Sequence, residues 1–392
     1  MFLSQRAQIL QESAIRKLDS AVRSYRDTHF YRLNIGQPDI ETHPAIRAAI
    51  QNWDTRVIAY GPASGTPECR KAFAAYHQKW LPSLGPEHIA VTTGGSEALL
   101  FAFTAICDPG DEIMVPAPYY TNYNGFATVA GATVCPIQTH LEKGFALPSN
   151  EQLDALKTPK TKAFVFSNPA NPTGAVYDIA EIKRIAKWCL QNQIFFISDE
   201  VYRRIWFDTP PASALQLEEE KEAVIVIDSL SKTWSACGLR LGALISRNTM
   251  LMEKIERLGQ ARLGVQPLAQ AAGIAALQLE DSYYEQIRLQ WKTRVDTLFE
   301  SLNTIPDISH NKPQGAFYTM VQLPVLSEDF AQFLIHDFRD HNESLVVAPG
   351  GGFYANPEHG RNLIRLAAVL EPEKIQRAVE ILGRALKQFA QR

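Results

Sequence analysis

The stretch AVIVIDSLSKTWSACGLRLGALIS, residues 223–246, decides the fold class of this chain. Two apolar runs, residues 223–229 and 241–246, flank a polar segment that contains Lys232. Apolar runs without alternation are typical of strands that are buried on both faces of a parallel sheet. Lys232 then follows the carboxyl end of a strand, which is where ligands bind in open α/β sheets.

Lys232 is a candidate for a Schiff base, because burial beside other cations lowers the pKa of a lysine and makes its amine nucleophilic. Ser229 and Arg240 flank it, and both are suited to hold a phosphate, the arginine as a bidentate clamp. From this segment alone, a solvated loop lysine is an equally good interpretation. The choice between the two therefore depends on the rest of the chain.

Further apolar runs predict the neighbouring strands of the sheet, at residues 112–116, 161–167 and 193–199. Between the last two, Asp178 and Glu181 form an approximate capping box before apolar residues at helical spacing, which predicts a helix. Strand, helix and strand in this order form a right-handed crossover unit. We therefore expect an α/β fold with a mostly parallel central sheet flanked by helices.

The chain has 392 residues, so two domains are expected. An amphipathic helix is predicted over about 281–302, and the residues after it indicate strands followed by a closing helix. We predict a large domain at 46–295 and a smaller α+β domain formed by 1–45 and 296–392.

Composition and charge exclude several classes of protein. Hydrophobic residues make up 46% of the chain, charged residues 21%, and the formal net charge is −3, so no basic surface for nucleic acid or for a membrane is expected. No apolar run approaches the roughly 18 residues that span a bilayer, and the first residues lack the pattern of a secretory signal. The five scattered cysteines lack a CxxC spacing, which favours reduced thiols in the cytoplasm and gives no sign of a metal site.

Two further segments present polar groups where predicted strands end or helices begin. Gly94, Gly95 and Ser96 open a predicted helix, where bare N–H groups and a hydroxyl form an anion site. Asn171 lies in a loop with two Asn-Pro pairs, residues 168–172, and offers its side-chain amide as a donor. A glycine turn before a helix is common by itself, whereas the doubled Asn-Pro is unusual and favours a functional loop over an ordinary turn.

Asp199 ends the apolar run 193–199, where a carboxylate is costly to bury without a cation. A protonated pyridine nitrogen would be such a cation. Pyridoxal 5′-phosphate (PLP) works as an electron sink only while that nitrogen keeps its proton. Tyr202, three residues further on, is suited to hydrogen-bond the phenolic oxygen of the same cofactor, alongside Asn171.

In their order and spacing, these motifs resemble those of the class I and II aminotransferases, in the aspartate aminotransferase-like branch of the fold-type I PLP family. The resemblance extends from about Asn34 to Ala368. It implies PLP as the cofactor, Lys232 as the Schiff-base lysine and general acid/base, and Asp199 and Tyr202 as further catalytic residues. The implied cofactor-binding residues are Gly95, Ser96, Tyr120, Asn171, Asp199, Tyr202, Ser229, Lys232, Arg240 and Tyr60.

The resemblance also implies an aromatic residue stacked on the cofactor ring and a contribution from a second subunit. Within PYYTNY, residues 118–123, Tyr120 aligns with the stacking residue, and Tyr119 is the alternative. Tyr60 matches a tyrosine that reaches the phosphate of the neighbouring subunit. The resemblance therefore implies a homodimer with shared active sites.

Substrate binding is implied for Gly36, Asn171 and Arg365. Gly36 matches a glycine whose backbone approaches the substrate carboxylate. Arg365 alternates with Ile364 and Leu366 along a predicted strand, so it points to the opposite face of the sheet. A planar guanidinium suits an α-carboxylate, and an internal ion pair is the alternative interpretation.

The implied reaction moves the amino group of an L-amino acid to a 2-oxo acid by a ping-pong mechanism. Aspartate and glutamate are slightly favoured over aromatic or broad neutral substrates. Arg262 is a candidate partner for the second carboxylate of an acidic substrate, although a surface or interface salt bridge is favoured for it. The alternative function is a PLP-dependent C–S lyase on the same fold. A PLP-responsive transcription regulator is disfavoured because the residues before Asn34 are too few for a DNA-binding domain.

Overall fold

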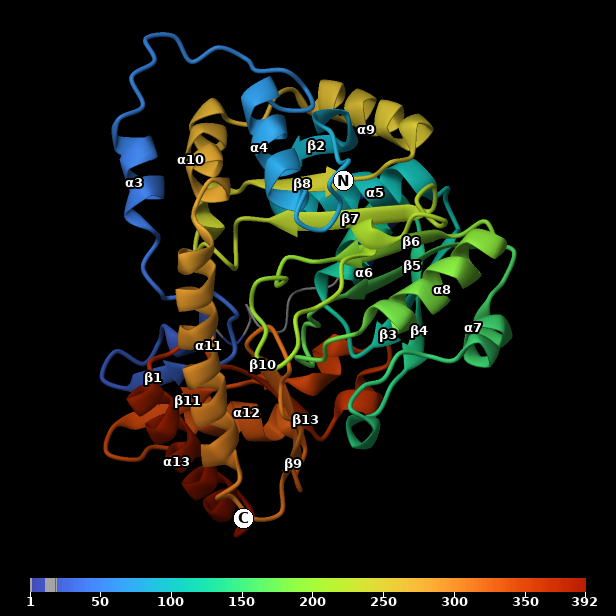
Figure 1. Ribbon diagram of the computed structural model, residues 1–392. Helices are drawn as coiled ribbons and strands as arrows, with labels where there is room; N and C mark the ends of the chain where they lie inside the picture. The colour runs from blue at the N-terminus through green and yellow to red at the C-terminus, as the bar shows by residue number, and fades with distance from the viewer. Residues whose placement is uncertain (1, 11–17, 19) are drawn as a thin grey trace.

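The computed structural model describes residues 2–10, 18 and 20–392 of the chain. A seven-stranded sheet with the strand order β2-β8-β7-β6-β5-β3-β4 forms its centre (Figure 1). The strands are β2 (Ile89–Thr92), β3 (Glu112–Ala117), β4 (Thr133–Gln138), β5 (Thr161–Ser167), β6 (Phe195–Asp199), β7 (Val224–Ser229) and β8 (Gly242–Ile245). β4, β3, β5, β6 and β7 run parallel, whereas β8 lies antiparallel to both of its neighbours. The prediction of an α/β fold with a mostly parallel central sheet is confirmed.

The apolar runs form the central strands because their side chains enter two cores on opposite faces of the sheet. In β7, Val226 belongs to one core, and Ile225 and Ile227 belong to the other. The predicted strand 193–199 begins later than expected, at Phe195, because the chain turns through Gln193 with a φ of 55°. No pattern in the sequence singles out β2, which is short, or β4, which is only partly buried.

Helices cover both faces of the large sheet. One face packs against α5 (Gly94–Ile106), α6 (Asn122–Ala130) and α9 (Thr249–Arg262). The other face packs against α4 (Pro67–His77), α7 (Asn150–Leu156) and α8 (Ile179–Gln191). Helices α3 (Pro44–Gln51) and α10 (Pro267–Leu277) pack on each other, and the short α1 (Gln5–Ile9) contacts α6.

Helix α8 begins at the capping box that the sequence predicts. The carboxylate of Asp178 accepts a hydrogen bond from the backbone N–H of Glu181 at 2.9 Å, and the Glu181 carboxylate accepts one from the N–H of Asp178 at 3.3 Å. The two bonds satisfy N–H groups that the first turn of a helix leaves without partners.

The C-terminal part of the chain builds a second, smaller sheet of strand order β12-β13-β10-β9. Its strands are β9 (Ser309–His310), β10 (Tyr318–Gln322), β12 (Ala348–Pro349) and β13 (Leu363–Ala367). Beside it, β1 (His29–Arg32) pairs in parallel with β11 (Glu343–Val346), so that a segment near the N-terminus joins the C-terminal part. Helices α12 (Ser327–His336) and α13 (Pro372–Phe389) pack against β11.

The long helix α11 (Asp281–Leu302) runs from the large sheet to the smaller one (Figure 1). Its bounds agree with the helix predicted over about 281–302. Among the helices of the described ranges, none is long and apolar enough to cross a membrane. None of the five cysteines is in a disulfide.

Candidate active site

The carboxyl ends of β5, β6 and β7 and the amino end of α5 border a cleft of about 820 Å³. The small sheet closes this cleft from the opposite side with residues of β10 and β13. Of the twelve site residues predicted from the sequence, all except Tyr60 line the cleft. These residues are Gly36, Gly95, Ser96, Tyr120, Asn171, Asp199, Tyr202, Ser229, Lys232, Arg240 and Arg365.

Lys232 follows β7, and its amine points toward the segment that leads from β1 into the cleft. Nζ donates a hydrogen bond to the carbonyl oxygen of Gly36 at 2.8 Å and lies 5.9 Å from the centre of the Tyr202 ring. A Cβ atom at Gly36 would lie 1.7 Å from the hydroxyl oxygen of Tyr318. A side chain at position 36 would therefore collide with Tyr318, which packs closely on this backbone.

Asp199 ends β6 and is buried. Its Oδ2 accepts a hydrogen bond from the hydroxyl of Tyr123 at 3.1 Å, and its Oδ1 accepts one from the backbone N–H of Val201 at 3.5 Å. Burial raises the pKa of the Asp199 carboxyl to about 7, although the bond from Tyr123 lowers it. A carboxylate in this position gains from a cationic partner, and a protonated pyridine nitrogen is one.

Polar groups gather at the amino end of α5. A Cβ atom at Gly94, where φ is 78°, would lie 2.6 Å from a guanidinium nitrogen of Arg240, and a Cβ atom at Gly95 would lie 3.8 Å from the Cβ of Ser229. The bare N–H groups of the helix, the hydroxyls of Ser96 and Ser229 and the guanidinium suit a phosphate.

Arg365 lies on β13, and its guanidinium is buried. Nη1 donates to the side-chain oxygen of Asn171 at 3.0 Å, and Nη2 donates to the carbonyl of Asn34 at 2.6 Å. The rings of Tyr318 and Phe353 lie 4.5 and 4.8 Å from its central carbon.

The guanidinium of Arg365 is nevertheless incompletely satisfied. Its Nε is buried without a hydrogen-bond partner, and burial lowers the pKa of the group. Within residues 2–10, 18 and 20–392, no carboxylate lies within salt-bridge distance of it, so the internal ion pair considered from the sequence is not found there. A carboxylate ligand would supply the missing charge and acceptor.

The cleft therefore combines a lysine, a buried carboxylate, a turn whose groups suit a phosphate, and a buried arginine. This set fits PLP, which has an aldehyde, a basic ring nitrogen and a phosphate, together with a substrate that carries a carboxylate.

Comparison with known proteins identifies the family. The family model "Aminotransferase class I and II" matches residues 28–382. The chain is 30% identical over 364 residues to a protein of Aquifex aeolicus named probable aspartate/prephenate aminotransferase, covering 90% of each chain. The chain belongs to the class I and II aminotransferases. It is also 28% identical over 400 residues to the aspartate/prephenate aminotransferase of Thermus thermophilus, covering 98% of this chain and 99% of that one.

Solved structures agree with this assignment. The aspartate aminotransferase of Thermotoga maritima superposes with a TM-score of 0.89 at 26% identity, over 98% of this chain and all of the other. The T. thermophilus aspartate aminotransferase with maleate has a TM-score of 0.88 at 27% identity and the same coverage. This aminotransferase is PLP-dependent, and its substrates are an amino acid and a 2-oxo acid. The comparisons do not favour the C–S lyase alternative.

In this aminotransferase, Tyr120 rather than Tyr119 lines the cleft. Tyr119 is buried elsewhere and donates its hydroxyl to the side-chain oxygen of Asn124 at 3.0 Å. The Tyr120 hydroxyl accepts a hydrogen bond from Asn122 at 2.7 Å, and its ring stands edge-on to Tyr123. Of the two candidates for the stacking residue, Tyr120 is the one with access to a ring in the cleft.

Tyr318 also lines the cleft, between its two halves, although no motif in the sequence indicates it. Its hydroxyl lies 2.9 Å from that of Tyr202, and its ring packs on Arg365. β10 pairs with β13 so that Met320 lies opposite Arg365. Tyr318 lies two residues before Met320, so its side chain is on the same face of the sheet as that of Arg365. Alternation along the strand could have indicated this face, but the register between the two strands is not visible in the sequence.

Arg262 forms a partly buried salt bridge within the chain, where the sequence favoured one at the surface or at an interface. Its guanidinium contacts the Glu97 carboxylate and donates to the carbonyl of Ala63 at 2.9 Å. Tyr60 lies between α3 and α4, outside the cleft, and its side chain is 85% exposed. Such an exposed position suits a residue that acts on another subunit.

Proposed function

We propose that this aminotransferase uses aspartate or glutamate as its amino donor, with Lys232, Asp199 and Tyr202 as catalytic residues. The observation that carries the binding of an amino acid is the buried Arg365, which lacks a carboxylate partner among the described residues and shares one cleft with Lys232 and Asp199, whereas the choice of an acidic amino acid rests on the relatives. A cation buried in this way is costly unless a ligand supplies the opposite charge.

The position of each side chain supports its proposed role. PLP supplies an electron sink for the negative charge that develops at the substrate Cα. Lys232 removes the Cα proton with Nζ and returns it later in the reaction. Asp199 stays charged and keeps the pyridine nitrogen protonated, while Tyr202 and Asn171 hydrogen-bond the ring oxygen. The remaining proposed cofactor contacts are Tyr120 on the ring and Gly95, Ser96, Ser229 and Arg240 at the phosphate.

The substrate carboxylate is proposed to bind Arg365, Asn171 and the backbone at Gly36. This arrangement sets the angle of the Cα–H bond, and mispositioning by about 1 Å costs roughly a hundredfold in rate. An acidic substrate is supported by the names of the relatives, which include aspartate/prephenate aminotransferases, and by the T. thermophilus enzyme with maleate.

We also propose a homodimer in which Tyr60 reaches the phosphate of the neighbouring active site, and a cytoplasmic enzyme whose five cysteines stay reduced. The exposure of Tyr60 and the five free thiols support these two proposals. We also propose a large domain at 46–295 and a small domain formed by 1–45 and 296–392. The pairing of β1 with β11 joins a segment near the N-terminus to the C-terminal part, which supports this division.

The first test is to mix the PLP-loaded enzyme with single amino acids, without any 2-oxo acid, and to follow the visible absorbance of bound PLP. We expect aspartate and glutamate to remove this absorbance with one equivalent of 2-oxo acid released, and an added 2-oxo acid to restore it. Steady formation of pyruvate and ammonia from cysteine conjugates, with the absorbance intact, would instead favour the C–S lyase.

Arg365→Gln tests the observation on which the proposal depends. We expect the KM for aspartate to rise about a hundredfold, because a charged hydrogen-bonded pair contributes about 2–3 kcal/mol. The absorbance of bound PLP should be unchanged, since Arg365 is assigned to the substrate. An unchanged KM would contradict the proposed role.

A further inference from the structure

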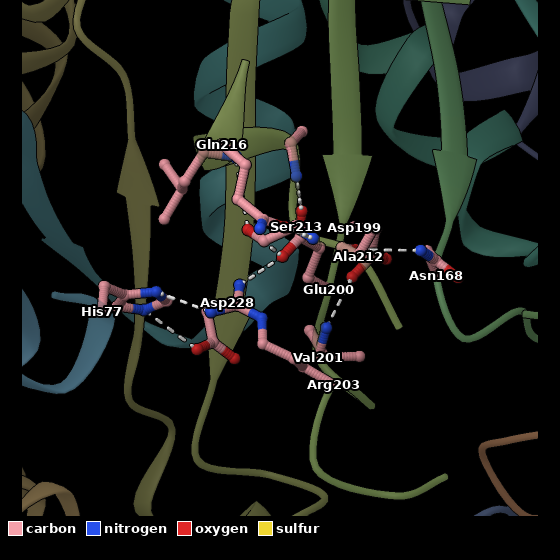
Figure 2. Close-up of polar contacts among 12 residues, drawn as sticks. His77, Asn168, Asp199, Glu200, Val201, Arg203, Ala212, Ser213, Gln216 and Asp228 are labelled. Carbon is pink, nitrogen blue, oxygen red and sulfur yellow. Dashed lines mark hydrogen bonds and ion pairs between the residues drawn. The ribbon is translucent and has the colours of Figure 1, made fainter. Parts of the chain in front are cut away.

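Four charged or titratable side chains form a cluster that the proposed mechanism does not use. Figure 2 shows these side chains, His77, Glu200, Arg203 and Asp228, which we call the buried charge cluster. They are 0%, 0%, 3% and 3% exposed, respectively. His77 ends α4, Glu200 and Arg203 follow β6, and Asp228 is near the end of β7. The cluster thus joins three elements that are far apart in the sequence.

The members of the buried charge cluster contact one another in a continuous series. Arg203 lies 2.5 Å from the Glu200 carboxylate and 2.7 Å from Nδ1 of His77, and Nε2 of His77 lies 3.1 Å from the Asp228 carboxylate. Arginine can only donate, so Nδ1 of His77 must accept, and a neutral His77 carries its proton on Nε2, facing Asp228. Burial and the neighbouring Arg203 lower the pKa of His77 to about 4, in agreement with this neutral form.

Both ends of this series of contacts accept hydrogen bonds from backbone N–H groups. Glu200 accepts hydrogen bonds from the hydroxyl of Ser213 and the N–H of Ala214, each at 2.8 Å. Asp228 accepts one from the backbone N–H of Ser229 at 2.7 Å. Ser229 is itself a proposed phosphate ligand, so Asp228 fixes the backbone of a residue that lines the cleft.

The cluster lies behind the cleft, on the other face of the same two strands. Asp199 and Ser229 continue the face of β6 and β7 that carries Ile197 and Ile227, whereas Asp228 continues the face of Val226. In sequence, each cluster residue of these strand ends adjoins a cleft residue. The pairs are Glu200 with Asp199, Arg203 with Tyr202, and Asp228 with Ser229.

We infer that the buried charge cluster positions the ends of β6 and β7 at the spacing that PLP requires. The inference rests on the proposed roles of Asp199, Tyr202 and Ser229. A shift of either strand end would move the ring-binding carboxylate relative to the phosphate-binding serine, and PLP contacts both. Buried ion networks rarely stabilise a fold more than apolar packing would, so a positioning role explains the cluster better than stability alone.

Asp228→Asn is the main test, because the amide oxygen still accepts from the Ser229 N–H while the charge that faces His77 is removed. We expect PLP to leave the variant holoenzyme about tenfold faster and kcat to fall about tenfold, with KM for the amino acid within about twofold. Repeated ultrafiltration in PLP-free buffer measures the release, and steady-state kinetics measures the split between kcat and KM. Release and kcat equal to those of the wild type would overturn the inference.

Substitutions of His77 test which of its two ring nitrogens accepts a hydrogen bond and which donates one. A glutamine can accept from Arg203 with its oxygen and donate to Asp228 with its amide, whereas alanine can do neither. We therefore expect His77→Gln to release PLP more slowly than His77→Ala. Equal rates of PLP release from these two variants would contradict the proposed arrangement. If His77→Ala does not fold, PLP release from His77→Gln can still be compared with that from the wild type.

A matched control separates positioning from general loss of stability. Glu343 pairs with Arg377 at 2.7 Å in the smaller part of the molecule, outside the cleft. Glu343→Gln should lower Tm and leave PLP release and kcat unchanged. If it accelerates release as much as Asp228→Asn does, the effect is one of stability and the inference fails. Absence of transamination by the wild-type enzyme in the same assays would instead contradict the proposed function.

Discussion

Tyr318 is the residue at which the proposed carboxylate site meets the cofactor site. Its hydroxyl lies 2.9 Å from that of Tyr202, and its ring lies 4.5 Å from the central carbon of Arg365. Tyr318→Phe keeps the ring on the guanidinium and removes only the hydroxyl. Since one hydrogen bond contributes about 1 kcal/mol, we expect kcat to fall about fivefold with little change in KM.

Steady-state kinetics of Tyr318→Phe checks this prediction against a matched loss of a buried hydroxyl. Tyr177→Phe removes a hydroxyl that donates to the carbonyl of Phe145 at 3.0 Å, away from the cleft. The Tyr177 variant should keep the kcat of the wild type. Equal losses in both variants would mean that the Tyr318 hydroxyl has no special role.

Asp199 makes the stability of the PLP-free protein depend on pH. Burial raises its pKa from 3.8 to about 7. The unfolded chain therefore loses this proton at lower pH than the folded protein does, and the folded state loses stability as the pH rises from about 4 to about 7. Asp199→Asn removes this titration. We expect the Tm of the PLP-free variant to exceed that of the PLP-free wild type above about pH 7.

Thermal unfolding of both PLP-free proteins, at about pH 4 and about pH 8, measures the difference. The two Tm values should lie closer together at the lower pH, where Asp199 is protonated in the folded state and only about half ionised in the unfolded state. A variant that is the less stable protein at both values would show that the carboxylate is already stabilised without PLP.

Which site residues the sequence reveals depends on how local their signal is. Lys232, Asp199 and Gly95 stand at strand ends or helix starts, so an apolar run and a turn are enough to place them. Tyr318 and His77 reach the same region from β10 and α4. Their contacts depend on the register of β10 with β13 and on how α4 packs, and neither is encoded in a short segment.

Between the elements α9 and α5, Arg262 and Glu97 form a salt bridge with both side chains less than one-fifth exposed. The Glu97 carboxylate also accepts a hydrogen bond from the backbone N–H of Thr93 at 2.7 Å. This bond holds the turn before α5 against the first turn of the helix. Arg262→Met should lower the free energy of unfolding by about 1–2 kcal/mol, between the values for exposed and buried pairs. It should not change the preference between acidic and neutral amino acids.

Chemical denaturation and the ratio of kcat/KM for aspartate and alanine check the Arg262 prediction. A selective rise in KM for aspartate would show instead that the guanidinium binds the second carboxylate, which is the alternative that the sequence left open.

Among the elements, burial and length together decide what is predictable. β5, β6, β7 and α11 were placed within about two residues because their apolar side chains follow the periods of a buried strand and an amphipathic helix. The antiparallel direction of β8 was not predicted, since an apolar run has no direction. The half-buried β4 has too few buried positions for its pattern to stand out.

At the scale of the whole molecule, one loop is hard to explain in a monomer. Val57, Ile58 and Tyr60 are 74%, 70% and 85% exposed, and they follow one another between α3 and α4. Neighbouring exposed apolar side chains mark a surface that another chain covers. The proposed homodimer would bury them and bring Tyr60 to the phosphate of the partner's site.

Mixed dimers test this arrangement. Lys232→Ala should be inactive and Tyr60→Ala strongly impaired, since each homodimer lacks one residue in both sites. In a dimer of one chain of each kind, the site that holds Lys232 also receives an intact Tyr60 from its partner. Random mixing of equal amounts should therefore restore about a quarter of the wild-type sites, because half of the dimers are mixed and each has one complete site. If Tyr60 served its own chain, or if the protein were a monomer, mixing would restore nothing, and the measured activity would equal the mean of the two variants.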